Sequence, residues 1–198
     1  MEKKSIRSEE DICQLISTDD WMMDILIATR TLQLPDWLVC AGFIRSKVWD
    51  TLHGYVHRTP LPDIDVIYYN PVDVDETIEK SLEHKLRGLL PSVPWSVKNQ
   101  ARMHGVNGQH PYASSTEAMS KFPETATAVG VRLLDDNRIE LATPWGVSDL
   151  LNRIVRPTPL FANRNSANVR IYEDRVAKKK WEQTWPLIHI VYPSESDI

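Results

Sequence analysis

Two carboxylates, Asp63 and Asp65, are the side chains of this sequence whose type and spacing most clearly allow chemistry. They begin the run DIDVIYY, which is typical of a β-strand, and side chains two residues apart on a strand lie on one face of the sheet. Two anions this close repel each other unless a cation lies between them. Mg²⁺ is the usual cation, because it takes oxygen ligands from one or two carboxylates and from substrate phosphates. The spacing therefore predicts a site for Mg²⁺, or for Mn²⁺, which suits similar ligands. The alternative is an ordinary strand start after Pro60 and Pro62, with both carboxylates solvated.

A second pattern, suited to phosphate, precedes the aspartates. The apolar run Trp37–Ala41 predicts a buried strand, and Gly42 then turns the chain into a helix that carries Arg45 in its first turn. The first N–H groups of a helix are free and lie at its positive end, where an anion is stabilised. Glycine lets a phosphate approach the backbone closely. We therefore expect a phosphate site at Gly42 and Arg45.

A third stretch, Trp95–Met103, follows the aspartates after one helix and reads as another strand. On such a strand Lys98 and Arg102 share one face and could line a pocket beside the aspartates. The alternative is a solvated strand face.

The elements that must position these residues alternate between helices and strands. Helical starts at 8–11 and 18–20 come first, and a long amphipathic helix is expected over 75–90. The remaining expected elements are a helix over 42–54, a strand over 63–69, a polar loop over 105–115, a hairpin from 127–134 and 138–142, a short helix over 145–155, a helix over 169–185 and an apolar tail over 187–192. This order predicts an α+β (mixed α/β) fold with a central sheet flanked by helices.

Composition limits the classes of protein to consider. With 198 residues and 42% hydrophobic residues, the chain suits one packed domain, which we divide into an N-terminal helical segment (1–35), a core (36–142) and a C-terminal helical extension (143–198). No apolar run reaches the ~20 residues of a membrane span and no signal peptide is visible, so we expect a soluble, cytoplasmic protein. The net charge of −4 argues against a general nucleic-acid binder. It favours a small-molecule or protein partner, and the oligomeric state stays open.

Several longer motifs carry a family resemblance. AGFIR at 41–45, DIDV at 63–66, VKNQARMH at 97–104 and TATAVGVR at 125–132 resemble a family of bacterial nucleotidyltransferase-like proteins of unknown substrate. That family is part of the superfamily that includes DNA polymerase β. The resemblance extends from about Trp37 to Pro186.

The resemblance implies a polymerase β-like fold and an Mg²⁺-dependent transfer of a nucleoside monophosphate from an NTP to an acceptor hydroxyl. In that scheme Asp63 and Asp65 are the catalytic metal ligands. Gly42 and Arg45 bind the triphosphate, and Ser46 supplies the hydroxyl contact that the superfamily usually makes from the residue after the glycine.

Two departures from the superfamily pattern matter. Phe43 stands where a glycine or serine is usual, and the 97–102 stretch contains none of the acids expected for a third metal-binding carboxylate. Asn99 could ligate a metal through its amide oxygen but cannot act as a base, and Glu140 is another substitute. The alternative function is therefore a catalytically degenerate member that binds nucleotide or a protein partner. A purely structural domain is the third hypothesis.

Overall fold

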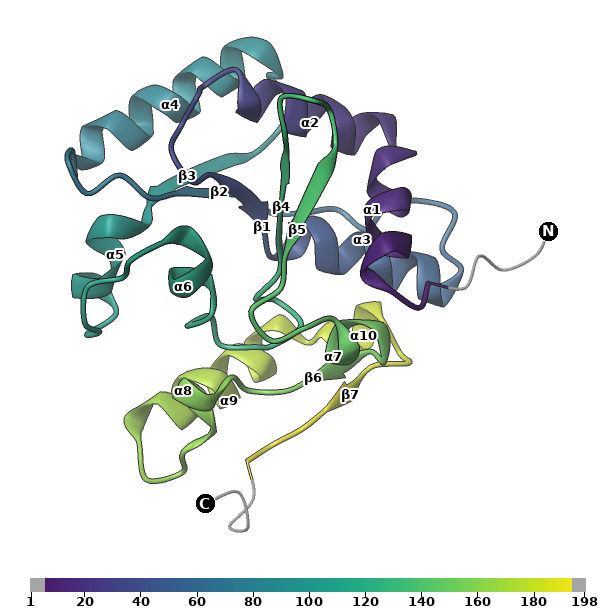
Figure 1. The fold of residues 1–198 in the computed structure, drawn as a ribbon. Helices are drawn as coiled ribbons and strands as arrows, with labels where there is room; N and C mark the ends of the chain where they lie inside the picture. The colour runs from purple at the N-terminus through teal and green to yellow at the C-terminus, as the bar shows by residue number, and fades with distance from the viewer. Residues whose placement is uncertain (1–5, 194–198) are drawn as a thin grey trace.

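The computed structural model describes residues 6–193, and a five-stranded mixed sheet forms its centre (Figure 1). The strands of this sheet are β1 (Leu38–Cys40), β2 (Ile64–Tyr68), β3 (Trp95–Asn99), β4 (Gly130–Leu133) and β5 (Ile139–Ala142), and a small second sheet consists of β6 (Ile154–Val155) and β7 (His189–Ile190). The helices are α1 (Glu9–Ser17), α2 (Asp20–Arg30), α3 (Gly42–His53), α4 (Glu76–Leu89), α5 (Gln100–Val106), α6 (Ser115–Met119), α7 (Ser148–Leu151), α8 (Pro159–Ala162), α9 (Ala167–Lys179) and α10 (Trp181–Thr184).

The strand order is β3-β2-β1-β4-β5, so β1 lies at the centre of the sheet. It pairs antiparallel with β2 and β4, and β4 continues antiparallel into β5. β2 and β3 are parallel and are joined by the α4 crossover. The prediction of an α+β fold with a central mixed sheet flanked by helices is confirmed.

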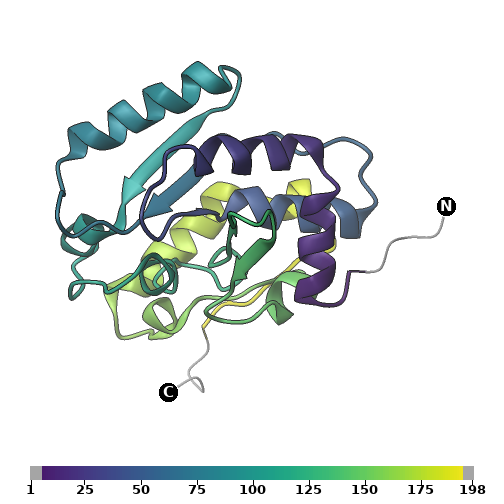
Figure 2. The same ribbon diagram turned by 45° about the horizontal axis from the view of Figure 1, so that its top comes forward.

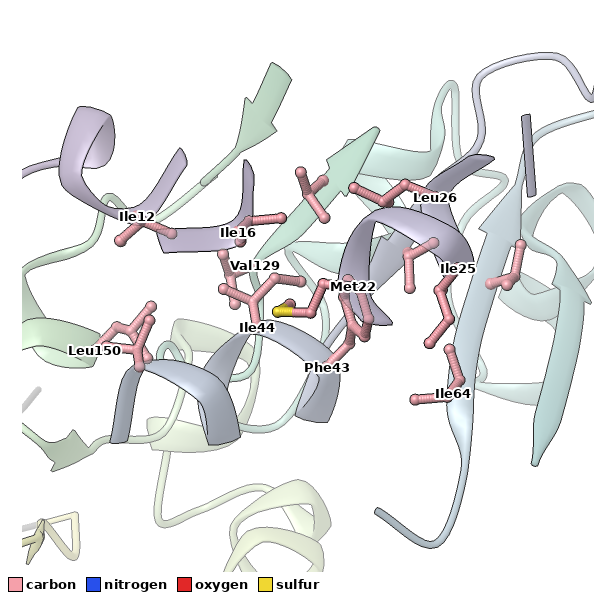
Figure 3. Close-up of a cluster of buried hydrophobic side chains, with 14 of the residues drawn as sticks. Ile12, Ile16, Met22, Ile25, Leu26, Phe43, Ile44, Ile64, Val129 and Leu150 are labelled. Atoms are coloured by element: carbon pink, nitrogen blue, oxygen red, sulfur yellow. The ribbon is translucent and has the colours of Figure 1, made fainter. Parts of the chain in front are cut away.

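The two faces of the sheet have different roles. On one face Val39, Ile64 and Val66 belong to the main hydrophobic core under α1–α3, where Figure 3 shows Ile64 near the side chains of α2 and α3. On the other face Cys40 and Ile67 belong to a smaller cluster with Met119 and Ala128. Because strand side chains alternate, Asp65 lies on this second face. It therefore projects away from the main core.

The C-terminal part of the chain covers the second face at one end of the molecule. Figure 1 shows α2 and α4 above the sheet and α8–α10 below it, and Figure 2 shows α9 running beside the central elements. Trp49 of α3 makes edge-on ring contacts with Trp181 and Trp185, at centroid distances of 6.2 and 5.2 Å. Its indole N–H donates to the carbonyl of Leu150 at 3.0 Å.

The α4 helix closes the outer edge of the sheet. The carboxylates of Glu79 and Glu83 accept the backbone N–H groups of Asn99 and Val97, at 2.9 and 3.2 Å. These N–H groups belong to the edge strand β3 and point away from β2. An unpaired edge strand can recruit another chain, and here two side chains satisfy it.

The predicted strand over 95–103 is wrong in its second half. β3 ends at Asn99, whose side chain accepts the N–H of Ala101 at 3.1 Å and caps helix α5. An asparagine that caps a helix ends the extended backbone at that residue. The loop expected over 105–115 is also shorter, because α5 runs to Val106 and α6 begins at Ser115.

The predicted helix over 169–185 is two helices. Lys180 has φ 47° and ψ 43°, the left-handed conformation that ends α9 before α10 begins. The short helix expected over 145–155 is limited to α7, and the rest of that stretch includes strand β6. The apolar tail forms β7, parallel to β6, and α8 was not predicted. No helix within residues 6–193 is long and apolar enough to cross a membrane.

Candidate functional site

Asp63 and Asp65 lie at the start of β2 and line one cavity of about 390 Å³. Asp65 is paired in register with Cys40 of β1 and with Ser96 of β3. Asp63 is two residues earlier, at the position that shares its side of the chain. The cavity also receives the first turn of α3 through Gly42.

The surroundings of Asp65 oppose its negative charge. Burial, and after it the neighbouring charge of Asp63, raise the pKa of this carboxyl group. The Ser96 hydroxyl, Arg175 and Arg45 lower it, and the net result is a pKa of about 6. A cation between the two carboxylates would favour the ionised form of Asp65.

The start of α3 faces the same cavity. Ala41 precedes the helix with φ 59° and ψ −120°, an arrangement that strains a residue with a Cβ atom and that concentrates at functional sites. A Cβ atom on Gly42 would meet Leu61 and Arg45 at ordinary contact distances of 3.5 and 3.6 Å. A Cβ atom would therefore fit at this position without a clash, and the glycine leaves that space free. Ser46 lines the cavity, and its buried hydroxyl has no hydrogen-bond partner within the described chain.

Phe43 does not obstruct the cavity side of the helix start. Its side chain is buried in the main core, where Figure 3 shows it near Met22, and its ring lies 5.9 Å from that of Trp21. The phenylalanine that stands here in place of the usual glycine or serine therefore contributes to the core. Gly42 and Ser46 remain on the cavity side of the turn.

Arg45 is a buried cation rather than a surface charge. Its guanidinium carbon lies 4.5 Å from the ring centroid of Trp181 and 5.4 Å from that of Trp49, and a terminal N–H donates to the Thr127 hydroxyl at 3.0 Å. Burial lowers its pKa to about 10, and the nearby charge of Glu124 opposes that change. Its Nε atom is buried without a partner among residues 6–193.

Arg175 lines the cavity and Glu124 binds it from behind the cavity wall, although neither residue was expected near the site. Glu124 is fully buried, and its carboxylate accepts the Nε–H of Arg175 at 2.6 Å. Its second oxygen has no partner in the part of the chain that the structure describes. In the sequence Arg175 stands near Lys178, Lys179 and Lys180 in the predicted helix, and such a group of basic residues is typical of a solvated helix face. The expectation that Thr127 belongs to a strand is also wrong, since β4 begins only at Gly130.

A second cavity has a volume of about 460 Å³ and is also lined by Asp65. It shares Ala41, Asp65 and Arg175 with the first cavity and has apolar walls from several elements. Lys98 contributes to this second cavity, but its ammonium group lies 3.1 Å from the carboxylate of Glu79.

Other expected residues lie elsewhere. Arg102 is on α5 and makes two 2.7 Å hydrogen bonds to Glu79, so the prediction that it shares a strand face with Lys98 is wrong. It lines neither of these cavities. Asn99 is paired with Tyr68, on the face of the sheet opposite Asp65, and its amide group binds the backbone of Asn70. That position does not suit a ligand of the same metal.

Glu140 is also unsuited to replace a third carboxylate. It lies on β5, at the edge of the sheet away from β2, and it pairs with Arg132. The neighbouring-strand position beside Asp65 belongs to Ser96. Within residues 6–193 no group of three or more His, Cys, Asp or Glu residues is placed to hold a metal ion. Two carboxylates still suit Mg²⁺ when substrate phosphates complete its shell.

Comparison with solved structures places this geometry among known folds. The chain is 35% identical to a protein whose NMR structure reveals a CCA-adding enzyme head domain, with a TM-score of 0.83, covering 96% of this chain and 98% of that one. A Thermotoga maritima CCA-adding enzyme complexed with tRNA is 13% identical with a TM-score of 0.56, covering 93% of this chain and 42% of the enzyme. A CCA-adding enzyme complexed with CTP is 10% identical with a TM-score of 0.59, covering 93% and 43%. The last two likenesses concern the fold.

A comparison with curated proteins found no match. The model of a nucleotidyltransferase family matches residues 28–190. This range includes Asp63, Asp65, the start of α3 and most of the C-terminal segment. By this match and by the fold, the chain belongs to the nucleotidyltransferase family, with a polymerase β-like fold.

Proposed function

We propose that this protein transfers a nucleoside monophosphate from an NTP to an acceptor hydroxyl, with Mg²⁺ or Mn²⁺ as cofactor. The observation that carries the proposal is the composition of the first cavity. One space of about 390 Å³ receives Asp63, Asp65, the start of α3 and the cationic side chains of Arg175 and Lys179. Paired carboxylates beside phosphate-binding groups are what a metal–triphosphate substrate requires.

The residues of the chain have separate tasks in this scheme. The free N–H groups at the start of α3 and the unpartnered Ser46 hydroxyl bind phosphate oxygens. Arg45, Arg175 and Lys179 balance the charge of the triphosphate. Asp63 and Asp65 hold the divalent ion, which when bound supplies charge neutralisation at the reacting phosphate.

The catalytically degenerate alternative rests on Ser96. A serine hydroxyl at the position beside Asp65 can donate a hydrogen bond to the carboxylate, but it cannot accept a proton as an acid's carboxylate would. Nucleotide binding is compatible with both functions. Release of pyrophosphate distinguishes them.

The acceptor is proposed to be a small molecule or a protein. The net charge of −4 supports this choice, since polynucleotide binding draws on a basic surface. A fold relative has been solved with tRNA, so charge alone does not exclude a nucleic-acid acceptor.

The test measures thermal stabilisation by each of the four NTPs, with and without Mg²⁺. At about 100 times Kd a bound nucleotide should add about 2.7 kcal/mol to the free energy of unfolding. We expect an Mg²⁺-dependent shift for at least one NTP in the wild type and in the control Asp20→Asn/Asp24→Asn, whose two aspartates are exposed on α2. The variant Asp63→Asn/Asp65→Asn should lose the shift while staying folded.

A shift that persists in the Asp63→Asn/Asp65→Asn variant would contradict the proposed site. Binding that is lost as expected, but without pyrophosphate release from any NTP when a small-molecule cell fraction supplies acceptors, would favour the degenerate alternative.

A further inference from the structure

The second cavity differs from the first because most of its walls are apolar. Its apolar walls come from β2, α5, α8, α9 and the segment after α6, and the larger apolar residues include Ile67, Met103, Phe122, Leu160, Phe161 and Ile171. A volume of about 460 Å³ is within the range of sites that enclose small molecules. The cavity meets the nucleotide cavity at Asp65 and Arg175, so its contents would lie beside the reacting centre.

The cationic side chains that line this cavity differ in whether a carboxylate of the chain already neutralises them. Lys98 lies 3.1 Å from Glu79, and Arg175 lies 2.6 Å from Glu124. Lys121 also lines the cavity, and within residues 6–193 it makes no ion pair or side-chain hydrogen bond. One cation without a partner beside apolar walls suits a ligand that is apolar in its body and anionic at one end.

The arrangement does not suit a polynucleotide strand. Among the described residues that line it, Phe122 and Phe161 are the aromatic side chains, and both are at least half-buried in the wall. A strand would need a basic groove with stacking rings along it. A small molecule with a single anionic group needs only the enclosed space and Lys121.

We propose that this cavity binds the acceptor, and that the acceptor is a small amphipathic molecule with an apolar body, one anionic group that pairs with Lys121, and a hydroxyl that reaches the Asp65 end. This inference rests on the proposed function for the direction of transfer. The class of ligand rests on the cavity itself.

The experiment uses 8-anilinonaphthalene-1-sulfonate, an apolar anion whose fluorescence rises in apolar sites, on the full chain. We expect saturable binding to the folded protein that Lys121→Gln weakens about fivefold. Ile171→Glu should weaken it about tenfold, because Ile171 is half-exposed on α9 at the cavity and a carboxylate there repels the sulfonate.

Two matched controls keep the test specific. Lys85→Gln changes an exposed lysine on α4, and Ile27→Glu changes an exposed isoleucine on α2, both outside this cavity. Neither should alter the binding.

Simultaneous addition of Mg²⁺ and the NTP identified above decides the role of the cavity. Binding of both compounds together supports an acceptor site. Displacement of the dye by the NTP assigns the cavity to the nucleoside and overturns the inference, as does unsaturable dye binding or an equal effect of the control variants. If no NTP binds while the dye follows the expected pattern, the proposed function fails and the ligand class of the cavity stands.

Discussion

At the scale of single residues, Asp65 is a carboxyl group that the fold holds in a place unfavourable to its charge. Its pKa is raised to about 6 in the folded protein. The unfolded value is near 4, so between these values the folded state binds more protons than the unfolded state. Stability therefore falls as the pH rises through this window, and the full destabilisation is present above about pH 7.

Replacing Asp65 by Asn should remove this term. We expect the free energy of unfolding of Asp65→Asn, relative to the wild type, to increase by up to roughly 3 kcal/mol between pH 4 and pH 8. Urea denaturation at both pH values measures the change. The control Asp24→Asn, at an exposed position of α2, should show no such pH-dependent gain. A constant difference at both pH values would contradict the raised pKa.

Glu124 is the second residue whose environment predicts a measurable change in the free energy of unfolding. Its carboxylate is fully buried, bonded to Arg175 and close to the buried Arg45. Removing the negative charge from a buried pair leaves the cations uncompensated, so Glu124→Gln should destabilise the protein by about 3 kcal/mol.

A double-mutant cycle isolates this interaction. Arg175→Gln added to Glu124→Gln should cost less than the sum of the two single changes, because the second substitution removes one of the uncompensated charges. Chemical denaturation of the four proteins gives the coupling energy. Strict additivity would show that the two side chains do not interact in solution.

At the scale of elements, the edge of β3 depends on α4. Glu79 accepts the N–H of Asn99 and binds Lys98 and Arg102, so it joins the helix to the strand and to α5. Glu79→Ala should destabilise the protein by about 1–3 kcal/mol and expose an unpaired edge N–H. Light scattering should show faster self-association than in Glu76→Ala, which changes an exposed residue on the same helix. Equal association rates would mean that the edge is protected by something else.

The sequence predicts an element well when the residues within that segment are enough to determine its structure. The α4 helix and the β2 strand follow from side-chain periodicity within each segment, and both were predicted near their observed bounds. The end of β3 was not, because the residues after Asn99 suit either backbone and one side-chain cap decides the outcome.

The site shows the same limit. The side-by-side placement of Asp63 and Asp65 follows from spacing alone. The pairing of Glu124 with Arg175 joins residues 51 positions apart, and the register that places Ser96 beside Asp65 is a property of two paired strands. No periodicity within one segment carries that information.

At the scale of the whole molecule, we infer that the described residues, 6–193, form one cooperative unit. A single hydrophobic cluster includes Ile6 and Ile188, and Trp185 donates its indole N–H to Asp50 at 2.8 Å. These contacts join the N-terminal segment, the core and the C-terminal extension. We therefore expect one unfolding transition, with coincident curves from far-ultraviolet circular dichroism and tryptophan emission. Two separated transitions would show that the extension beyond residue 142 unfolds on its own.

The enclosure of Arg45 by Trp181 and Trp185 also sets an order in time. During translation Asp63 and Asp65 are synthesised early, but the C-terminal residues that complete their cavity are synthesised later. At roughly 5–20 residues per second, about ten seconds of translation separate the two events. During that interval the nascent chain carries the two aspartates without the residues that close the cavity, so under the proposed function nucleotide binding follows the emergence of the C-terminal helices.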